Sequence, residues 1–256
     1  MSNDVDSYKR STTVENAFHL LEYIKENDGA TLNGLTAEFG MAKSTIYRYM
    51  STLEHLRYVL REEGVYYPSL RLLDFAEYAR TRKPGYALAK EKVEELANQT
   101  EERVQFLVEE HGKGVYVYRS TGSKAVKTDP GIGKEVYLHI IAAGKAILAH
   151  LSRSRVEGII ETHGLPAITE HTITDKKVLF NQLDKINDRG YSLNRQESVE
   201  GLHAVGVPIL GADKRVIGAL SISGPSHRFK GERFEEHLPD QLLGVANELE
   251  LNIAHS

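Results

Sequence analysis

A glycine between two short amphipathic segments places the strongest constraint on the first part of the chain. Gly40 separates residues 32–39 from residues 43–57. Apolar residues recur at helical spacing in both segments, and glycine readily takes the left-handed conformation that ends a helix sharply. The sequence therefore predicts two helices joined by a tight bend at Gly40.

The second of these segments has two chemically different faces. Ile46, Met50 and Leu53 fall on one side at helical spacing and are expected to pack inward. An arginine can bond guanine through two donors, and short hydroxyls can hold phosphates. We therefore predict a DNA-reading helix-turn-helix, with contacts made by the polar residues at the start of the second helix. These residues are Lys43, Ser44, Thr45, Tyr47 and Arg48.

The surrounding pattern completes a small domain. Thr12 and Glu15 have the spacing of a capping box ahead of a third helix, whose apolar stripe includes Val14 and Phe18. Residues 58–67 have the pattern of a hairpin, which would form a wing. We predict a winged helix-turn-helix over residues 1–67, a linker helix over 68–83 that ends at Pro84-Gly85, and a second domain over 84–256. A plain bundle of three helices remains the alternative for the first part.

Charge gives this prediction only local support. Residues 1–83 contain 11 Lys or Arg against 12 Asp or Glu, whereas a DNA-binding domain usually carries a basic surface. Within residues 41–61, however, there are four basic residues and a single acidic one, Glu54. The predicted wing tip, Glu62-Glu63, is acidic, which leaves a contact between the wing and DNA open.

From Pro84 onward, helical and strand-like patterns alternate. The strands are expected near residues 104–108, 115–118, 191–193, 204–210 and 216–223, and the last two form a hairpin. Residues 121–134 are expected to be a long loop. Residues 138–151 are expected to form a single helix, and residues 176–189 another. The whole chain is therefore predicted to be α+β, with a mostly antiparallel sheet and flanking helices in the second domain.

Several functional classes find no support in the sequence. The chain has no cysteine, and no apolar run approaches the roughly 20 residues that cross a bilayer, so we expect a cytoplasmic protein without membrane contact. There is no GxSxG motif, no phosphate loop around Gly144-Lys145-Ala146 and no HExxH spacing among the 11 histidines. We expect no catalytic residues, no cofactor and no metal, and an enzyme remains the less favoured alternative.

Four stretches carry a resemblance to a known family. They are residues 138–151 (LHIIAAGKAILAHL), Gly190-Tyr191-Ser192, Gly201-Leu202 and residues 216–229 (VIGALSISGPSHRF). They resemble the effector domain of IclR-family transcription regulators, and the predicted helix-turn-helix lies where that family has its own. The resemblance implies a winged-helix DNA reader, a linker helix used in dimerisation and a GAF-like effector domain. It also implies a homodimer or tetramer, which we expect to read double-stranded DNA at a pseudo-palindromic operator.

The resemblance further implies a pocket for a small-molecule effector. The matching positions are Thr128, Ala142, Ala143, Asn194, Leu202, Ala204, Ser221 and Ser223. Independently of the family, the hydroxyls of Ser221 and Ser223 share one face of a strand, and backbone N–H groups at a helix start near Ala142 favour an anion. These features suit a small carboxylate. The alternatives are a solvated strand face and a DNA-binding oligomer that has no effector.

Two positions depart from relatives that sense small oxo-acids. Such relatives tend to have an acidic residue where this chain has Asn194 and a cysteine where it has Ala204. Extra polar side chains nearby favour a more polar ligand, such as a sugar acid or hydroxy acid. These side chains are Thr128 and Asn194, together with Arg195, Glu197, His139 and His203.

Overall fold

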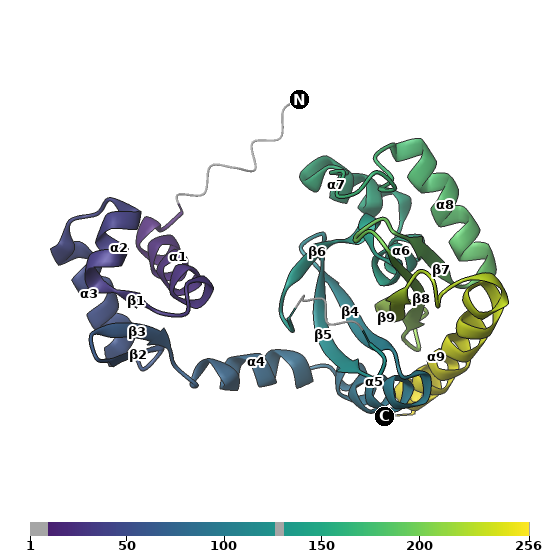
Figure 1. Cartoon of the computed structure of the whole chain (residues 1–256), viewed down its shortest axis with the longest axis horizontal. Coiled ribbons are helices and arrows are strands. Elements are labelled where there is room, and N and C mark those ends of the chain that lie inside the picture. Colours follow the sequence, from purple (N-terminus) through teal and green to yellow (C-terminus); the bar gives the residue numbers. More distant parts are fainter. Residues whose placement is uncertain (1–9, 126–130, 256) are drawn as a thin grey trace. The chain divides into compact units, whose positions relative to one another are not determined.

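The computed structural model describes residues 10–125 and 131–255. The chain divides into two compact units, residues 1–79 and 80–256. The division falls within helix α4 (Leu72–Thr81), so the boundaries expected at residues 67 and 83 stay predictions. The architecture is α+β, as the sequence predicted, with a helix-turn-helix first and an antiparallel sheet with helices second (Figure 1).

The N-terminal unit is built from three helices and a small antiparallel sheet of order β1-β3-β2. Leu20, Ile24, Leu35, Ile46 and Met50 are fully buried between these elements, which makes one small core. The helices are α1 (Thr12–Glu26), α2 (Leu32–Phe39) and α3 (Lys43–His55), and the strands are β1 (Ala30–Thr31), β2 (Val59–Glu62) and β3 (Val65–Pro68).

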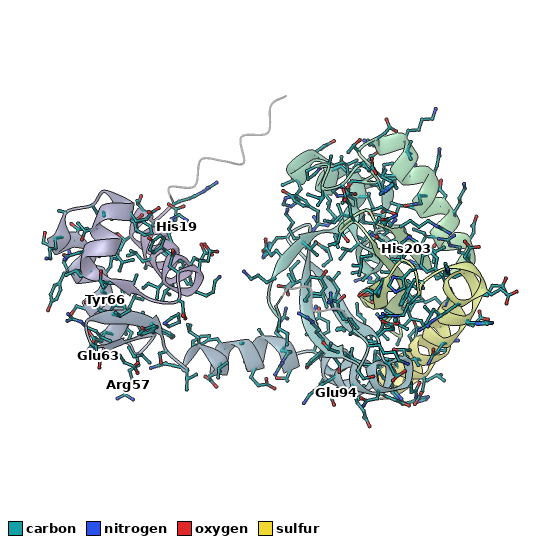
Figure 2. All side chains as sticks on the ribbon, in the orientation of Figure 1. His19, Arg57, Glu63, Tyr66, Glu94 and His203 are labelled. Carbon is teal, nitrogen blue, oxygen red and sulfur yellow. The ribbon has the colours of Figure 1, made fainter. Side chains whose placement is uncertain are left out.

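The bend between α2 and α3 is as predicted. Gly40 caps α2 in the left-handed conformation, with φ of 60°. The wing hairpin also forms, because Glu62 pairs with Val65 across a two-residue turn in which Glu63 and Gly64 both have positive φ. Figure 2 shows Tyr66 of β3, which is buried, and Glu63 at the turn.

The start of α1 differs from the prediction. Ser11, not Thr12, is the N-cap residue, and no side chain caps the helix. The apolar stripe is rotated as well, because Leu20 and Ile24 are buried, whereas Val14 and Phe18 are 55% and 63% exposed. The capping box and the inward position of these two residues were therefore wrong.

The C-terminal unit contains a six-stranded antiparallel sheet of order β6-β5-β4-β9-β8-β7. Its strands are β4 (Arg103–Glu110), β5 (Lys113–Thr121), β6 (Glu135–Tyr137), β7 (Ser192–Arg195), β8 (Leu202–Leu210) and β9 (Val216–Pro225). Its helices are α5 (Pro84–Thr100), α6 (Ala142–Ala149), α7 (Arg153–His163), α8 (Lys176–Arg189) and α9 (Leu238–Ala254), with a 3-10 turn at Leu138–Ile140 and a π-helical turn at Arg233–His237.

Helices cover both faces of this sheet (Figure 1). Helices α5 and α9 pack on one face against residues such as Phe106, Leu220 and Ile222. Helices α6, α7 and α8 pack on the other face, where Leu107 and Ala219 belong to a second cluster. Successive residues of a strand alternate between faces, so the hydroxyls that flank Ile222 point to the α6 side.

Residues 138–151 do not form the single helix that was expected. The chain makes a 3-10 turn at Leu138–Ile140, becomes extended at Ile141 and starts α6 at Ala142. A side chain at Gly144 would come within 2.2 Å of the Leu138 carbonyl oxygen, so the glycine permits this fold of the chain. The break places the first turn of α6 against the sheet, beside Gly206 of β8.

Candidate functional sites

The start of α3 presents the predicted DNA-contacting residues. Lys43, Ser44, Tyr47 and Arg48 are exposed, and Thr45 is half-buried. On the opposite side, Ile46, Met50 and Leu53 fix the helix in the core. No side chain caps the start of α3, so its first backbone N–H groups suit phosphate oxygens.

The rest of the α3 surface contributes less than its composition suggests. The hydroxyl of Thr52 donates to the carbonyl oxygen of Arg48, 2.8 Å away within the same helix. Arg57 lies beyond the end of α3, with φ of 63°. The polar residues at the start of the helix are therefore the better candidates for base contacts.

A cavity of about 210 Å³ lies on the α6 side of the large sheet, in the C-terminal unit. Its floor is formed by aligned residues of neighbouring strands. Asn194 pairs with Ala204, Ala204 with Ser223, and Ser223 with Arg103. Ser221 and Gln105 form the next pair along the strands. The remaining wall is mostly apolar and comprises Tyr116, Val136, Ile140, Ile141, Ala142, Val199 and Leu202, together with Ser198.

The cavity brings together six of the eight effector residues expected from the sequence. They are Ala142, Asn194, Leu202, Ala204, Ser221 and Ser223. Ala143 does not line it and packs in the cluster between α6 and the sheet. Thr128 lies outside the described residues.

The polar groups of the cavity differ in how they are satisfied. Ser223 is 5% exposed, and its Oγ has no hydrogen-bond partner among the described residues. Asn194, in contrast, uses both ends of its amide inside the protein. Its Nδ2 donates to the Ile140 carbonyl oxygen at 2.5 Å, and its Oδ1 accepts from the Glu197 backbone N–H at 3.2 Å. Ser223 therefore offers a free group to a ligand, whereas Asn194 ties the cavity walls together.

Among the lining residues that sequence reasoning missed, Arg103 and Tyr116 have ionisable side chains. Arg103 is 3% exposed and is the only charged side chain among the described residues that line the cavity. Burial raises the pKa of Tyr116 to about 12, against the opposing effect of Arg103 and Arg119, so the Tyr116 phenol stays neutral. The alternation of Arg103 and Gln105 along β4 indicated that these two side chains share one face of the strand, but not which face.

Four of the six polar residues nominated for ligand selectivity do not line the cavity. Arg195 pairs with Glu235 at 2.8 Å, and Glu197 pairs with the buried Lys145. A ring nitrogen of His139 lies 3.2 Å from the Pro166 carbonyl oxygen, and one of His203 lies 2.7 Å from that of Phe229. Figure 2 shows His203 among the packed side chains of the C-terminal unit. Each of the four is engaged within the protein.

No helix among residues 10–125 and 131–255 is long and apolar enough to cross a membrane.

Two family models match the chain. The IclR helix-turn-helix domain matches residues 13–63, and the C-terminal domain of bacterial transcriptional regulator IclR matches residues 78–250. Together they span both compact units.

Relatives with assigned names agree with these models. The chain is 32% identical to the probable HTH-type transcriptional regulator ArcR of Halobacterium salinarum, over 96% of this chain and 95% of that protein. It is 29% identical to the HTH-type transcriptional regulator KdgR of Escherichia coli, over 92% of this chain and 90% of that protein.

Solved structures share the fold along nearly the whole chain. The Thermotoga maritima IclR structure has a TM-score of 0.81 and 28% identity, over 94% of this chain and 98% of that one. An IclR homologue from Microbacterium hydrocarbonoxydans, complexed with 4-hydroxybenzoate, has a TM-score of 0.84 and 20% identity, over 96% of this chain and all of that one. The chain therefore belongs to the IclR family, as a transcriptional regulator with an N-terminal helix-turn-helix and a C-terminal effector-binding domain.

Proposed function

We propose that this regulator binds a pseudo-palindromic operator as a homodimer or tetramer, and that a small organic acid or sugar acid in the cavity controls that binding. The observation that carries the effector part is the buried floor of Arg103, Gln105, Ser221 and Ser223 beneath an otherwise apolar wall. Concave sites with apolar walls and a few convergent polar groups are typical of small-molecule binding. The role is regulatory and not catalytic, as in the named relatives.

The chemistry of the cavity favours an anion. The guanidinium of Arg103 places a positive charge in the buried lining, and a nearby opposite charge favours the ionised form of an acid. The Ser223 hydroxyl adds a donor without a partner among the described residues. Ala142 brings the start of α6, which no side chain caps, to the cavity wall, and helix starts favour negative groups. A carboxylate satisfies all three features, and a structural neighbour was crystallised with one.

The volume of the cavity suits a small effector. At about 210 Å³ it lies below the roughly 300–1,000 Å³ of sites that hold drug-sized ligands. Short organic acids and compact sugar acids are both small enough for such a site. The four engaged polar residues around the cavity give no preference for the sugar acids, so the two classes have to be separated by experiment.

Exposed apolar side chains support self-association. Leu70, Leu73, Phe75 and Tyr78, in and just before α4, are 55% to 77% exposed. A monomer rarely exposes such a set on one short element. We propose that α4 contributes to a homodimer, which would present two α3 helices to two half-sites.

The test is fluorescence anisotropy of the full chain on DNA from directly upstream of its own gene, with scrambled DNA as the control. The titration is repeated with pyruvate, 4-hydroxybenzoate, gluconate and other small acids. Selective binding that one acid changes at least tenfold supports the proposal. Selective binding that no carboxylate changes would favour the rival, a DNA-binding oligomer without an effector of this class. If the chain preferred no DNA sequence, including sequences selected from a random pool, the proposed operator binding would be contradicted.

A further inference from the structure

A buried ion pair lies beside the cavity and is not part of its lining. Lys145 of α6 is fully buried, and Glu197 is 5% exposed. Lys145 Nζ donates to Glu197 Oε1 at 2.6 Å, to Glu197 Oε2, and to the Leu193 carbonyl oxygen at 2.9 Å. These three bonds use all the donors of the ammonium group. Burial lowers the pKa of Lys145, and the charge of Glu197 opposes that shift.

Glu197 belongs to a stretch without helix or strand that forms part of the cavity. We name residues 196–201 the wall segment; two of them, Ser198 and Val199, line the cavity. The segment leaves β7 at Arg195 and enters β8 at Leu202. Irregular segments of this kind depend on side-chain contacts for a fixed position.

The contacts of the wall segment converge on Glu197. Its backbone N–H donates to Asn194 Oδ1, and its carbonyl oxygen accepts from Thr172 Oγ1 at 2.7 Å. Thr169 Oγ1 donates to the neighbouring carbonyl oxygen of Gln196, also at 2.7 Å. The carboxylate of Glu197 reaches past these groups to Lys145, so α6, β7 and the wall segment meet at one buried residue.

The energetics of buried ion pairs make a purely stabilising role a poor explanation. Removing two charges from water costs about as much as their attraction returns, and well-packed apolar replacements are often neutral or stabilising. Such a pair instead demands one geometry, because displacing either partner leaves a buried charge without a counterpart. The pair thus selects one position for the segment that carries Glu197.

We propose that the buried Lys145–Glu197 ion pair is a positioning element of the effector site, which fixes the wall segment to α6 so that Ser198 and Val199 close the cavity. Its importance for effector binding rests on the function proposed above. The positioning itself does not, because it can be measured without DNA or effector.

The test is hydrogen exchange of the full chain with the pair replaced by two residues of similar length, Lys145→Met with Glu197→Met. The reporters are three backbone amides whose hydrogen bonds hold the wall segment. The amide of Gln196 donates to the Leu202 carbonyl oxygen, and that of Leu202 donates to the Val199 carbonyl oxygen. The amide of Gly201 donates to Gln196 Oε1. We expect these amides to exchange at least about tenfold faster in the double variant. Amides further along the β8–β9 ladder, from Ala204 to Ile209 of β8, should keep their wild-type rates.

A second ion pair, more exposed than the first, supplies a control for the loss of an ion pair elsewhere in the same unit. Lys92 and Glu248 join α5 to α9 at 2.7 Å, far along the chain from the wall segment. Lys92→Met with Glu248→Met should leave the exchange of the wall segment unchanged. Wild-type protection of the wall segment in the Lys145–Glu197 double variant would overturn the proposal. So would a uniform loss of protection across the C-terminal unit, or failure to fold, since either would show that the pair serves the fold as a whole.

Discussion

At the scale of single residues, exposure separates the side chains that can meet DNA from those that hold α3 in place. Lys43 and Arg48 are both exposed near the start of the helix, while Ile46 between them is fully buried. The sequence could reveal this division because a helix alternates its faces with a fixed period. It could not separate Arg57 from the helix, because the positive φ of that residue arises at the helix end.

Two of these residues are expected to contribute differently to DNA binding. Arg48→Ala should cost roughly 1–3 kcal/mol on the operator and relax the preference at one base pair, because a base contact is lost. Lys43→Ala should weaken all sequences alike and lower the salt slope by about one, because a phosphate contact is lost. Anisotropy titrations on operator and random DNA at several salt concentrations distinguish the two. Equal losses on both DNAs for Arg48→Ala would refute the base contact.

The Ser223 hydroxyl has no hydrogen-bond partner among the described residues, so its removal should affect stability and ligand binding in opposite ways. Removing a buried hydroxyl without a partner costs the folded protein nothing, so Ser223→Ala should keep or raise the melting temperature. The same substitution should weaken binding of the effector acid by about 1 kcal/mol or more, since a hydrogen bond to a charged group is lost. Ser192→Ala is the matched control, because Ser192 Oγ donates to the Ala142 carbonyl oxygen at 2.6 Å and its loss should lower the melting temperature. A clear destabilisation by Ser223→Ala would contradict the assignment.

His139 makes stability depend on pH in a defined direction. Burial lowers its pKa below the ordinary 6.5, although its bond to Pro166 favours the charged form. The unfolded chain therefore takes up a proton at pH values where the folded chain does not. This contribution to stability is complete above about pH 6.5 and is lost as pH falls through the lowered pKa. Chemical unfolding between about pH 5 and 8 should show a shallower acid loss for His139→Gln. Parallel profiles for variant and wild type would exclude this role.

At the scale of elements, the sequence predicted helices and strands well where one periodicity runs without interruption. Residues 176–189 were expected to be a helix and form α8, and the β8–β9 hairpin also lies where expected. The errors fall where tertiary contacts decide. The two residues of β1 are too few to show a pattern, and residues 138–151 break at Ile141 because the start of α6 packs against Gly206.

The cavity shows the same limit. Alternation along β9 was enough to place Ser221 and Ser223 on one face, and the family resemblance supplied Ala142, Asn194, Leu202 and Ala204. Arg103 and Gln105 were missed because their place depends on the pairing of β4 with β9, which joins strands far apart in the sequence. The hydrogen bond of Asn194 to Ile140 and the ion pair of Glu197 with Lys145 also join elements that are distant in the sequence.

Helix α4 leads to a prediction about assembly. Leu73 is 62% exposed, so Leu73→Asp should leave the fold intact but place a charge in the proposed dimer contact. We expect a smaller species in sedimentation velocity and weaker binding to a two-half-site operator, with binding to a single half-site unchanged. Val178→Asp on α8, where Val178 is 52% exposed, is the control and should change neither. Unaltered sedimentation of Leu73→Asp would argue against a dimer through α4.

At the scale of the whole molecule, the central claim is that the effector cavity and the operator site are coupled. A ligand shifts DNA binding only if its affinity differs between the DNA-bound and free forms of the protein. The coupling is reciprocal, so an acid that changes operator affinity by a given factor must have its own affinity changed by the same factor when operator is bound.

The most direct measurement is therefore a pair of titrations with the acid that changes DNA binding most. Operator affinity is measured with and without saturating acid, and acid affinity is measured by calorimetry with and without saturating operator. We expect two equal factors in the wild-type chain, and reduced affinity for the acid in Ser223→Ala. Two results would contradict the proposed coupling. The acid could bind Ser223→Ala as tightly as it binds the wild-type chain, or operator affinity could stay unchanged at saturating acid.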